Sequence, residues 1–160
     1  MKIKALIMDV DGTLTDGCIY IGSEGEIMKR FDVKDGYAIH NILPSLGIKP
    51  IIITGRESKI VERRCKELGI TELVQGSSNK VKDMINILAK LDISLEETAY
   101  IGDDFPDKEC MEMVSICGCP MDAIDEIKSI CNFISTKNGG NGAVRDFIEW
   151  IRDTINNDTK

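Results

Sequence analysis

The sequence predicts an α/β domain built on a doubly wound, mostly parallel sheet in three layers. Short apolar runs alternate with longer segments of helical period along the 160 residues, which is typical of a sheet covered by helices on both faces. The apolar runs are nearly continuous, as expected for strands buried on both sides. A chain of this length can bury one full core. We therefore expect residues 1–156 to form a single domain and residues 157–160 to be a frayed tail.

The apolar runs predict the positions of the strands. Runs 3–8, 49–53 and 98–101 are the clearest candidates for buried strands. Runs 114–117 and 133–134 predict weaker ones. Because the runs alternate with helical segments, most of these strands should lie parallel to one another.

Segments whose apolar residues recur with helical period lie between and after these runs. These helix candidates are 36–46, 57–68, 79–91, 105–113, 122–130 and 142–156. In the last one, Val144, Phe147, Ile148 and Ile151 recur at helical spacing, so one face of this helix should pack on the core.

One stretch, residues 18–31, interrupts the alternation. Two apolar segments flank Gly22-Ser23-Glu24-Gly25, and this pattern predicts a β-hairpin. The hairpin lies between the first strand and the first helix, beside the place where an open α/β sheet has its ligand crevice. We expect it to protrude from the domain.

The composition excludes several classes of partner. The formal net charge is −7, so nucleic acid and anionic membrane surfaces are disfavoured as partners. The N-terminal stretch before Asp9 is too short for a signal peptide, and no apolar run approaches the roughly 20 residues needed to span a bilayer. We expect a cytoplasmic protein whose six cysteines stay reduced. A zinc site at Cys117, Cys119, Cys131 and His40 is disfavoured by their spacing.

The first chemical motif is Asp9-Val10-Asp11-Gly12, directly after the first strand. Two carboxylates two residues apart at the end of a strand can point into one crevice. A divalent cation bound there would neutralise them and an approaching phosphate group. Gly12 permits a tight turn and a close approach of the backbone. Taken alone, the motif fits an ordinary acidic turn equally well.

Two further segments supply groups that can bind phosphate. Thr54 and Gly55 follow the strand 49–53, where a hydroxyl and backbone N–H groups can reach phosphate oxygens. Lys80 opens the helix candidate 79–91, at the end where the helix dipole disfavours a cation. This position indicates a functional lysine, although a solvated surface lysine also fits.

The last motif, Gly102-Asp103-Asp104-Phe105-Pro106-Asp107, follows the strand 98–101. Its carboxylates are hard oxygen ligands of the kind that Mg²⁺ prefers. They also fit the N-cap of a helix with proline in its first turn, and the two interpretations are compatible.

The four motifs in this order resemble those of the haloacid dehalogenase-like phosphatase superfamily. The resemblance implies that Asp9 is the nucleophile and Asp11 the general acid and base. It implies that Thr54, Gly55 and Lys80 bind the phosphoryl group. Mg²⁺ would then be held by Asp9, the backbone carbonyl of Asp11, and Asp103. Asp104 and Asp107 would support these ligands.

Motifs along nearly the whole chain narrow the resemblance. There is no room for a cap domain on either side of the strand 49–53, and segments such as Phe31–Tyr37 and Gly139–Arg145 are similar to those of the 3-deoxy-D-manno-octulosonate (Kdo) 8-phosphate phosphatases. This resemblance implies a small-molecule sugar phosphate as substrate, release of Kdo for lipopolysaccharide synthesis, and a homotetramer whose hairpins meet at its centre. Active sites would lie near subunit interfaces.

Several alternatives concern the substrate and the assembly. Arg56 and Arg64 are candidates for binding the α-keto carboxylate, because a guanidinium can grip a carboxylate with two hydrogen bonds. A nononate (sialic acid or deaminated nononate) 9-phosphate phosphatase fits the same chemistry, but Arg56 stands where that family tends to have an acidic residue. A non-catalytic assembly module, related to cytidylyltransferase tails, would be expected to lose some of the catalytic residues kept here. Glycines 139–142 fit either a helix start or a tail element that reaches a neighbouring subunit.

Overall fold

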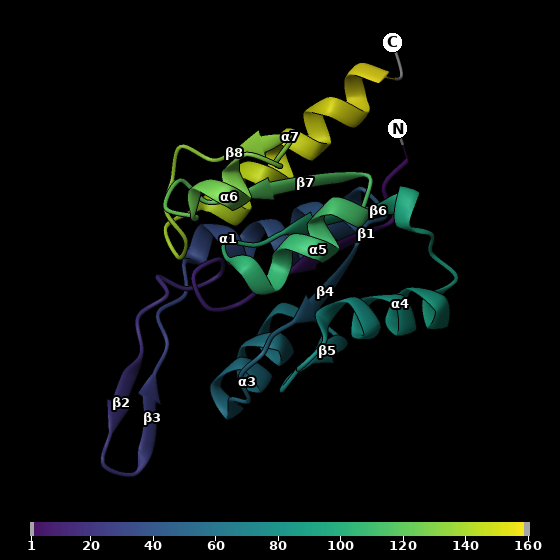
Figure 1. The fold of residues 1–160 in the computed structure, drawn as a ribbon. Coiled ribbons are helices and arrows are strands. Elements are labelled where there is room, and N and C mark those ends of the chain that lie inside the picture. Colours follow the sequence, from purple (N-terminus) through teal and green to yellow (C-terminus); the bar gives the residue numbers. More distant parts are fainter. Residues whose placement is uncertain (1, 159–160) are drawn as a thin grey trace.

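The computed structural model describes residues 2–158 and shows a parallel sheet between two layers of helices (Figure 1). Six strands lie in the order β5-β4-β1-β6-β7-β8, and all neighbouring pairs are parallel. They are β1 (Ala5–Met8), β4 (Lys49–Ile53), β5 (Glu72–Val74), β6 (Thr98–Ile101), β7 (Ile116–Cys119) and β8 (Phe133–Ile134). The predicted fold class is confirmed. The short edge strand β5 was not predicted.

The sheet is buried on both faces, which is why its strands are apolar without alternation. Along β1, Leu6 and Met8 belong to one core cluster while Ala5 and Ile7 belong to the other, because successive side chains point to opposite faces. The first cluster includes residues of the π-helical turn η1 (Ala38–Ile42), of α3 (Lys59–Leu68) and of α7 (Ala143–Asp158), such as Ile39 and Phe147. The second cluster includes residues of α4 (Lys80–Leu91), α5 (Phe105–Met113) and α6 (Asp125–Lys128).

Several of the helices begin at a residue whose side chain accepts hydrogen bonds from the first turn. The structure contains α1 (Val33–Tyr37), a π-helical turn η1 (Ala38–Ile42), α2 (Leu43–Ser45), α3 (Lys59–Leu68), α4 (Lys80–Leu91), the 3₁₀ turn η2 (Leu95–Glu97), α5 (Phe105–Met113), α6 (Asp125–Lys128) and α7 (Ala143–Asp158). The first helix begins earlier than predicted, because Asp32 accepts hydrogen bonds from the backbone N–H groups of Lys34 and Asp35. Residues 159 and 160 of the predicted tail lie outside the described residues.

The hairpin consists of β2 (Tyr20–Gly22) and β3 (Gly25–Met28), which pair in antiparallel fashion. It extends away from the body of the domain, at the lower left of Figure 1. Four of its apolar residues are between 47% and 66% exposed: Ile19, Ile21, Ile27 and Met28. Apart from this hairpin, residues 2–158 form no unit outside the sheet and its helices, so nothing in the described chain covers the sheet edge as a cap would.

Two further expectations can be compared with the structure. Among residues 2–158, no helix combines the length and the apolar character that crossing a membrane requires. All six cysteines are free thiols, and His40 contacts the backbone carbonyl of Leu68.

Candidate active site

Asp9 lies at the carboxyl end of β1, in the centre of the sheet. Its side chain is buried, with 8% of the residue exposed, and its backbone N–H donates to the carbonyl of Ile101 at 3.1 Å. The chain then turns sharply, since the carbonyl of Val10 accepts hydrogen bonds from the N–H groups of Thr13, Leu14 and Thr15. This turn keeps the segment after Asp9 beside the ends of the neighbouring strands.

Gly12 allows Asp103 to approach this turn. Gly12 has a φ of +89°, and a Cβ atom there would lie 2.1 Å from Oδ2 of Asp103. Thr13 donates its hydroxyl to Oδ1 of Asp103 at 2.9 Å. A glycine is therefore needed at position 12 for both backbone conformation and space.

Lys80, the first residue of α4, bridges two carboxylates. Its Nζ donates to Oδ1 of Asp9 at 2.8 Å and to Oδ1 of Asp107 at 2.7 Å. The ammonium is almost wholly buried, which would be costly without these partners. Burial lowers the pKa of Lys80, but the charges of Asp9 and Asp107 and their hydrogen bonds outweigh this effect, so that the pKa is raised. The lysine therefore stays a cation beside Asp9.

Asp107 has no exposed surface and uses both of its oxygens within the protein. Oδ1 also accepts from the hydroxyl of Tyr100 at 2.8 Å, and Oδ2 accepts from the N–H of Asp103 at 3.1 Å. Its role is therefore to hold Lys80 and the loop that carries Asp103.

Thr54 follows β4 and is 2% exposed. Its N–H donates to the carbonyl of Val74 at 2.9 Å, and its carbonyl accepts from the N–H of Ser77 at 3.1 Å. These bonds place the loop after β5 next to the loop after β4. Ser77 and Ser78 thereby reach the site, although the sequence analysis did not select them.

These loops enclose a cleft of about 380 Å³ at the carboxyl edge of the sheet. Every predicted site residue lines it except Arg64. The lining residues are Asp9, Asp11, Thr54, Gly55, Arg56, Ser77, Ser78, Lys80, Asp103, Asp104, Pro106 and Asp107. Arg64 lies elsewhere, with its guanidinium 5.5 Å from the ring centre of Phe31, and it pairs with Glu67. Within one subunit, Arg64 is therefore not part of this cleft.

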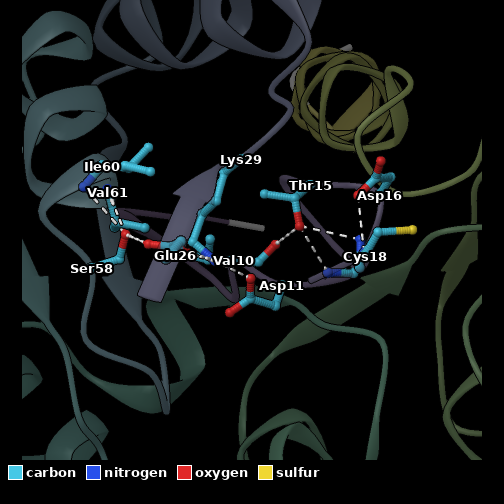
Figure 2. A network of polar contacts seen from close by, with 12 residues as sticks. Val10, Asp11, Thr15, Asp16, Cys18, Glu26, Lys29, Ser58, Ile60 and Val61 are labelled. Carbon is cyan, nitrogen blue, oxygen red and sulfur yellow. Dashed lines mark hydrogen bonds and ion pairs between the residues drawn. The ribbon is translucent and has the colours of Figure 1, made fainter. Parts of the chain in front are cut away.

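Asp11 contacts a residue that the sequence analysis missed. Its Oδ1 accepts a hydrogen bond from Nζ of Lys29, at the base of the hairpin (Figure 2). The glycine-rich segment 139–142 supports the same loop from the other side. The N–H of Gly140 donates to the carbonyl of Thr13, and a Cβ on Gly139 would lie 2.0 Å from the carbonyl oxygen of Gly12.

The cleft has the donor set of a hard metal ion. Carboxylate oxygens of Asp9, Asp103 and Asp107 lie within 4.8 Å of one another. Burial, followed by the nearby charge of Asp107, raises the pKa of Asp9 well above its usual value, and burial also raises the pKa of Asp103 to about 6. A cation would relieve this unfavourable arrangement. Asp107 is engaged through both of its oxygens, whereas Lys80 and Thr13 donate to only one oxygen of Asp9 and of Asp103, so these two side chains are the candidates to bind it.

Two sequence comparisons place the chain in a family. Residues 66–148 match the profile of the haloacid dehalogenase-like hydrolases. Over 150 residues the chain is 46% identical to the 3-deoxy-D-manno-octulosonate 8-phosphate phosphatase of Escherichia coli K12. The aligned region covers 94% of this chain and 79% of that protein. The chain belongs to the Kdo 8-phosphate phosphatase family of haloacid dehalogenase-like hydrolases. It is therefore a phosphoric monoester hydrolase, as the motifs predicted.

Solved structures of the Kdo 8-phosphate phosphatase family agree with this fold. The Moraxella catarrhalis enzyme, in complex with magnesium, phosphate and Kdo, superposes with a TM-score of 0.89 at 42% identity over 93% of this chain and 85% of its own. The cobalt-bound enzyme of Haemophilus influenzae gives a TM-score of 0.89 at 33% identity, over 94% and 87% of the two chains. The predicted family is confirmed.

Proposed function

We propose that this phosphatase hydrolyses Kdo 8-phosphate to Kdo and phosphate, in lipopolysaccharide synthesis, through an aspartyl-phosphate intermediate on Asp9. The observation that carries the proposal is the buried Lys80 cation held between Asp9 and Asp107 at the cleft. A lysine so placed can bind a phosphoryl oxygen while it keeps the nucleophilic carboxylate in line. The same chain is 46% identical to a Kdo 8-phosphate phosphatase along almost its whole length.

The phosphate group would be bound by groups from three loops. Lys80 supplies a cation, Thr54 a hydroxyl, and Gly55 a backbone N–H, all in the lining of the cleft. Asp9 and Asp103, with the backbone carbonyl of Asp11, would hold Mg²⁺. Bound there, the ion would neutralise the carboxylates and the phosphate so that one anion can attack another.

The reaction would proceed in two displacements at phosphorus. In the first, a carboxylate oxygen of Asp9 attacks, the bond to the sugar oxygen breaks, and Asp11 gives that oxygen its proton. In the second, Asp11 as a carboxylate takes a proton from water, the water oxygen attacks phosphorus, and the bond to Asp9 breaks. Phosphate leaves, and both aspartates return to their starting states.

Arg56 is our candidate for the cleft residue that binds the sugar carboxylate. It is exposed and lines the mouth beside Gly55, where a guanidinium can meet the carboxylate of the substrate. Arg64 would reach a cleft only as part of an assembly. The exposed apolar hairpin supports self-association, which we propose to be a homotetramer, because a monomer would leave four large apolar side chains in water. Light scattering of the purified protein measures this assembly directly.

The decisive experiment compares two sugar phosphates. Purified protein with Mg²⁺ is incubated with Kdo 8-phosphate or with a nononate 9-phosphate, and inorganic phosphate is measured. We expect a preference for the Kdo ester that EDTA abolishes and that Arg56→Glu reduces. Preference for the nononate would keep the chemistry and overturn the substrate. Release from neither ester would contradict the proposal.

A further inference from the structure

The carboxylate of Asp11 is held from outside the cleft. Among residues 2–158, its one hydrogen-bond partner is Nζ of Lys29, which follows β3 at the base of the hairpin (Figure 2). Lys29 does not line the cleft, so its ammonium approaches Asp11 from the hairpin side. This contact joins the protruding hairpin to the residue that must exchange a proton with the substrate.

Lys29 is itself fixed in position. Its side chain is 2% exposed, and its Nζ makes a second ion pair with Oε1 of Glu26 at 2.9 Å. Glu26 accepts a hydrogen bond from the hydroxyl of Ser58, and Ser58 is the N-cap of α3. The N–H of Ser58 donates to Oε1 of Gln75 at 2.8 Å. The chain of contacts thus runs from the start of α3 through the hairpin to Asp11.

The charge of Lys29 is maintained by these partners. Burial alone would lower the pKa of Lys29, but the hydrogen bonds with Asp11 and Glu26 raise it. A buried ammonium is retained in a fold when its partners compensate for lost water. Without it, the carboxylates of Asp11 and Glu26 would face each other with no cation between them, and Asp11 would turn away.

We propose that Lys29 is a positioning residue for Asp11, and that the Lys29–Glu26–Ser58 contacts orient the Asp11 carboxyl group for proton transfer to the leaving group. The proposal rests on the function proposed above, in which Asp11 is the general acid and base. Lys29 acts through Asp11 and does not touch the phosphate. Because Lys29 belongs to the hairpin, the position of the hairpin would affect the rate of turnover.

The consequence is a defect that depends on the leaving group. An alkoxide such as a sugar oxygen leaves only with a proton, whereas an aryl oxide such as p-nitrophenolate leaves without one. Loss of orientation at Asp11 should therefore slow the attack of Asp9 on alkyl phosphates far more than on aryl phosphates. A merely structural role for Lys29 would slow both reactions alike.

The test measures kcat/KM for Kdo 8-phosphate and for p-nitrophenyl phosphate in four proteins: wild type, Lys29→Met, Lys29→Arg and Asp11→Asn. For Lys29→Met we expect a loss of about 10- to 100-fold with the sugar ester, part of what a general acid contributes, and less than about 3-fold with the aryl ester. The fall should lie in kcat, with KM little changed. Asp11→Asn should show the same selectivity, and Lys29→Arg should recover most of the activity. Lys90→Met, which removes a surface pair with Glu72, is the matched control.

Equal losses with both esters, or no loss, would overturn the proposal. If Lys29→Met does not fold, Lys29→Gln, which keeps a donor without the charge, takes its place in the same comparison. If wild type turns over another alkyl phosphate but not Kdo 8-phosphate, the substrate proposal fails while the comparison proceeds with that ester. Crystal structures of wild type and variant provide a readout without turnover. An Asp11 carboxylate unmoved in the variant would also overturn the proposal.

Discussion

Lys80 donates from the first turn of α4 to Asp107 at 2.7 Å, and the same ammonium donates to Asp9, the proposed nucleophile, at 2.8 Å. Asp107 therefore controls where the cation of the site lies, although it is itself out of reach of solvent. A lysine at a helix start is opposed by the helix dipole, and here two carboxylates outweigh that effect.

We predict that Asp107→Asn lowers kcat by about 10- to 100-fold, as expected when a catalytic cation is misplaced. Oδ2 of Asp107 accepts from the N–H of Asp103, so an amide NH₂ group at that place would set donor against donor. The variant should also be destabilised by about 3 kcal/mol, since a buried ion pair loses one partner. Phosphate release and thermal unfolding measure the two effects. The control is Asp125→Asn, at the start of α6, which should match wild type.

Gly12→Ala should abolish activity, because the new Cβ would lie 2.1 Å from Oδ2 of Asp103. Gly47→Ala is the matched control, since Gly47 also has a positive φ, of +69°, but has open space around it. Each substitution should cost about 1 kcal/mol of backbone strain. Measuring phosphate release by both variants then separates the effect of the clash with Asp103 from the effect of backbone strain. Comparable activity in both variants would show that the approach of Asp103 to Gly12 is not needed.

The sequence alone predicted most of the fold for a physical reason. Parallel strands buried on both faces must be continuously apolar, so β1, β4 and β6 were visible as runs. The edge strand β5 was missed because it has three residues, begins with Glu72, and is only partly buried. The predicted helix 122–130 is shorter in the structure, where α6 spans Asp125–Lys128.

The site was predictable where its residues follow strands. Asp9 and Thr54 come directly after strands of the same sheet, Asp103 follows a third strand after Gly102, and parallel strands bring their carboxyl ends to one edge. Lys29 was missed because a lysine in an exposed hairpin has no local signal of burial. Its burial depends on Asp11 and Glu26, which approach only in the folded chain. Arg64 packs over Phe31, a contact that its spacing along α3 did not reveal.

Asp35 should make stability depend on pH. Its carboxyl group is buried and accepts the N–H of Arg145 at the start of α7, and burial raises its pKa from 3.8 to about 6. Between these values the folded protein holds a proton that the unfolded chain has released. The free energy of unfolding should therefore fall as pH rises from about 4 to about 6, by up to about 3 kcal/mol.

Asp35→Asn cannot ionise, and its amide oxygen can still accept from Arg145. Above pH 6 the variant should be more stable than wild type, by about 1 to 3 kcal/mol, and near pH 4 the two should be alike. Urea unfolding across this pH range measures the difference. A variant that is less stable than wild type by the same amount at every pH would refute this account of Asp35.

Magnesium should stabilise the folded protein if, as proposed, it binds between Asp9 and Asp103, whose carboxylates are costly to ionise together. At a concentration 100 times its Kd, the gain should be about 2.7 kcal/mol. Protons compete for Asp103, whose pKa is about 6, so the apparent affinity should fall as pH falls through this value. Thermal unfolding with increasing Mg²⁺, near pH 5 and near pH 8, measures both effects. An equal response in Asp103→Asn would place the ion elsewhere.

The most direct test of the central claim is to trap the covalent intermediate. The protein with Mg²⁺ and Kdo 8-phosphate is quenched during turnover and treated with borohydride, which reduces an aspartyl phosphate to homoserine. Peptide mass spectrometry then locates the change. We predict homoserine at position 9, with none in Asp9→Asn and none without substrate. Turnover that continues with no reduced residue, or with the change at another aspartate, would contradict Asp9 as the nucleophile.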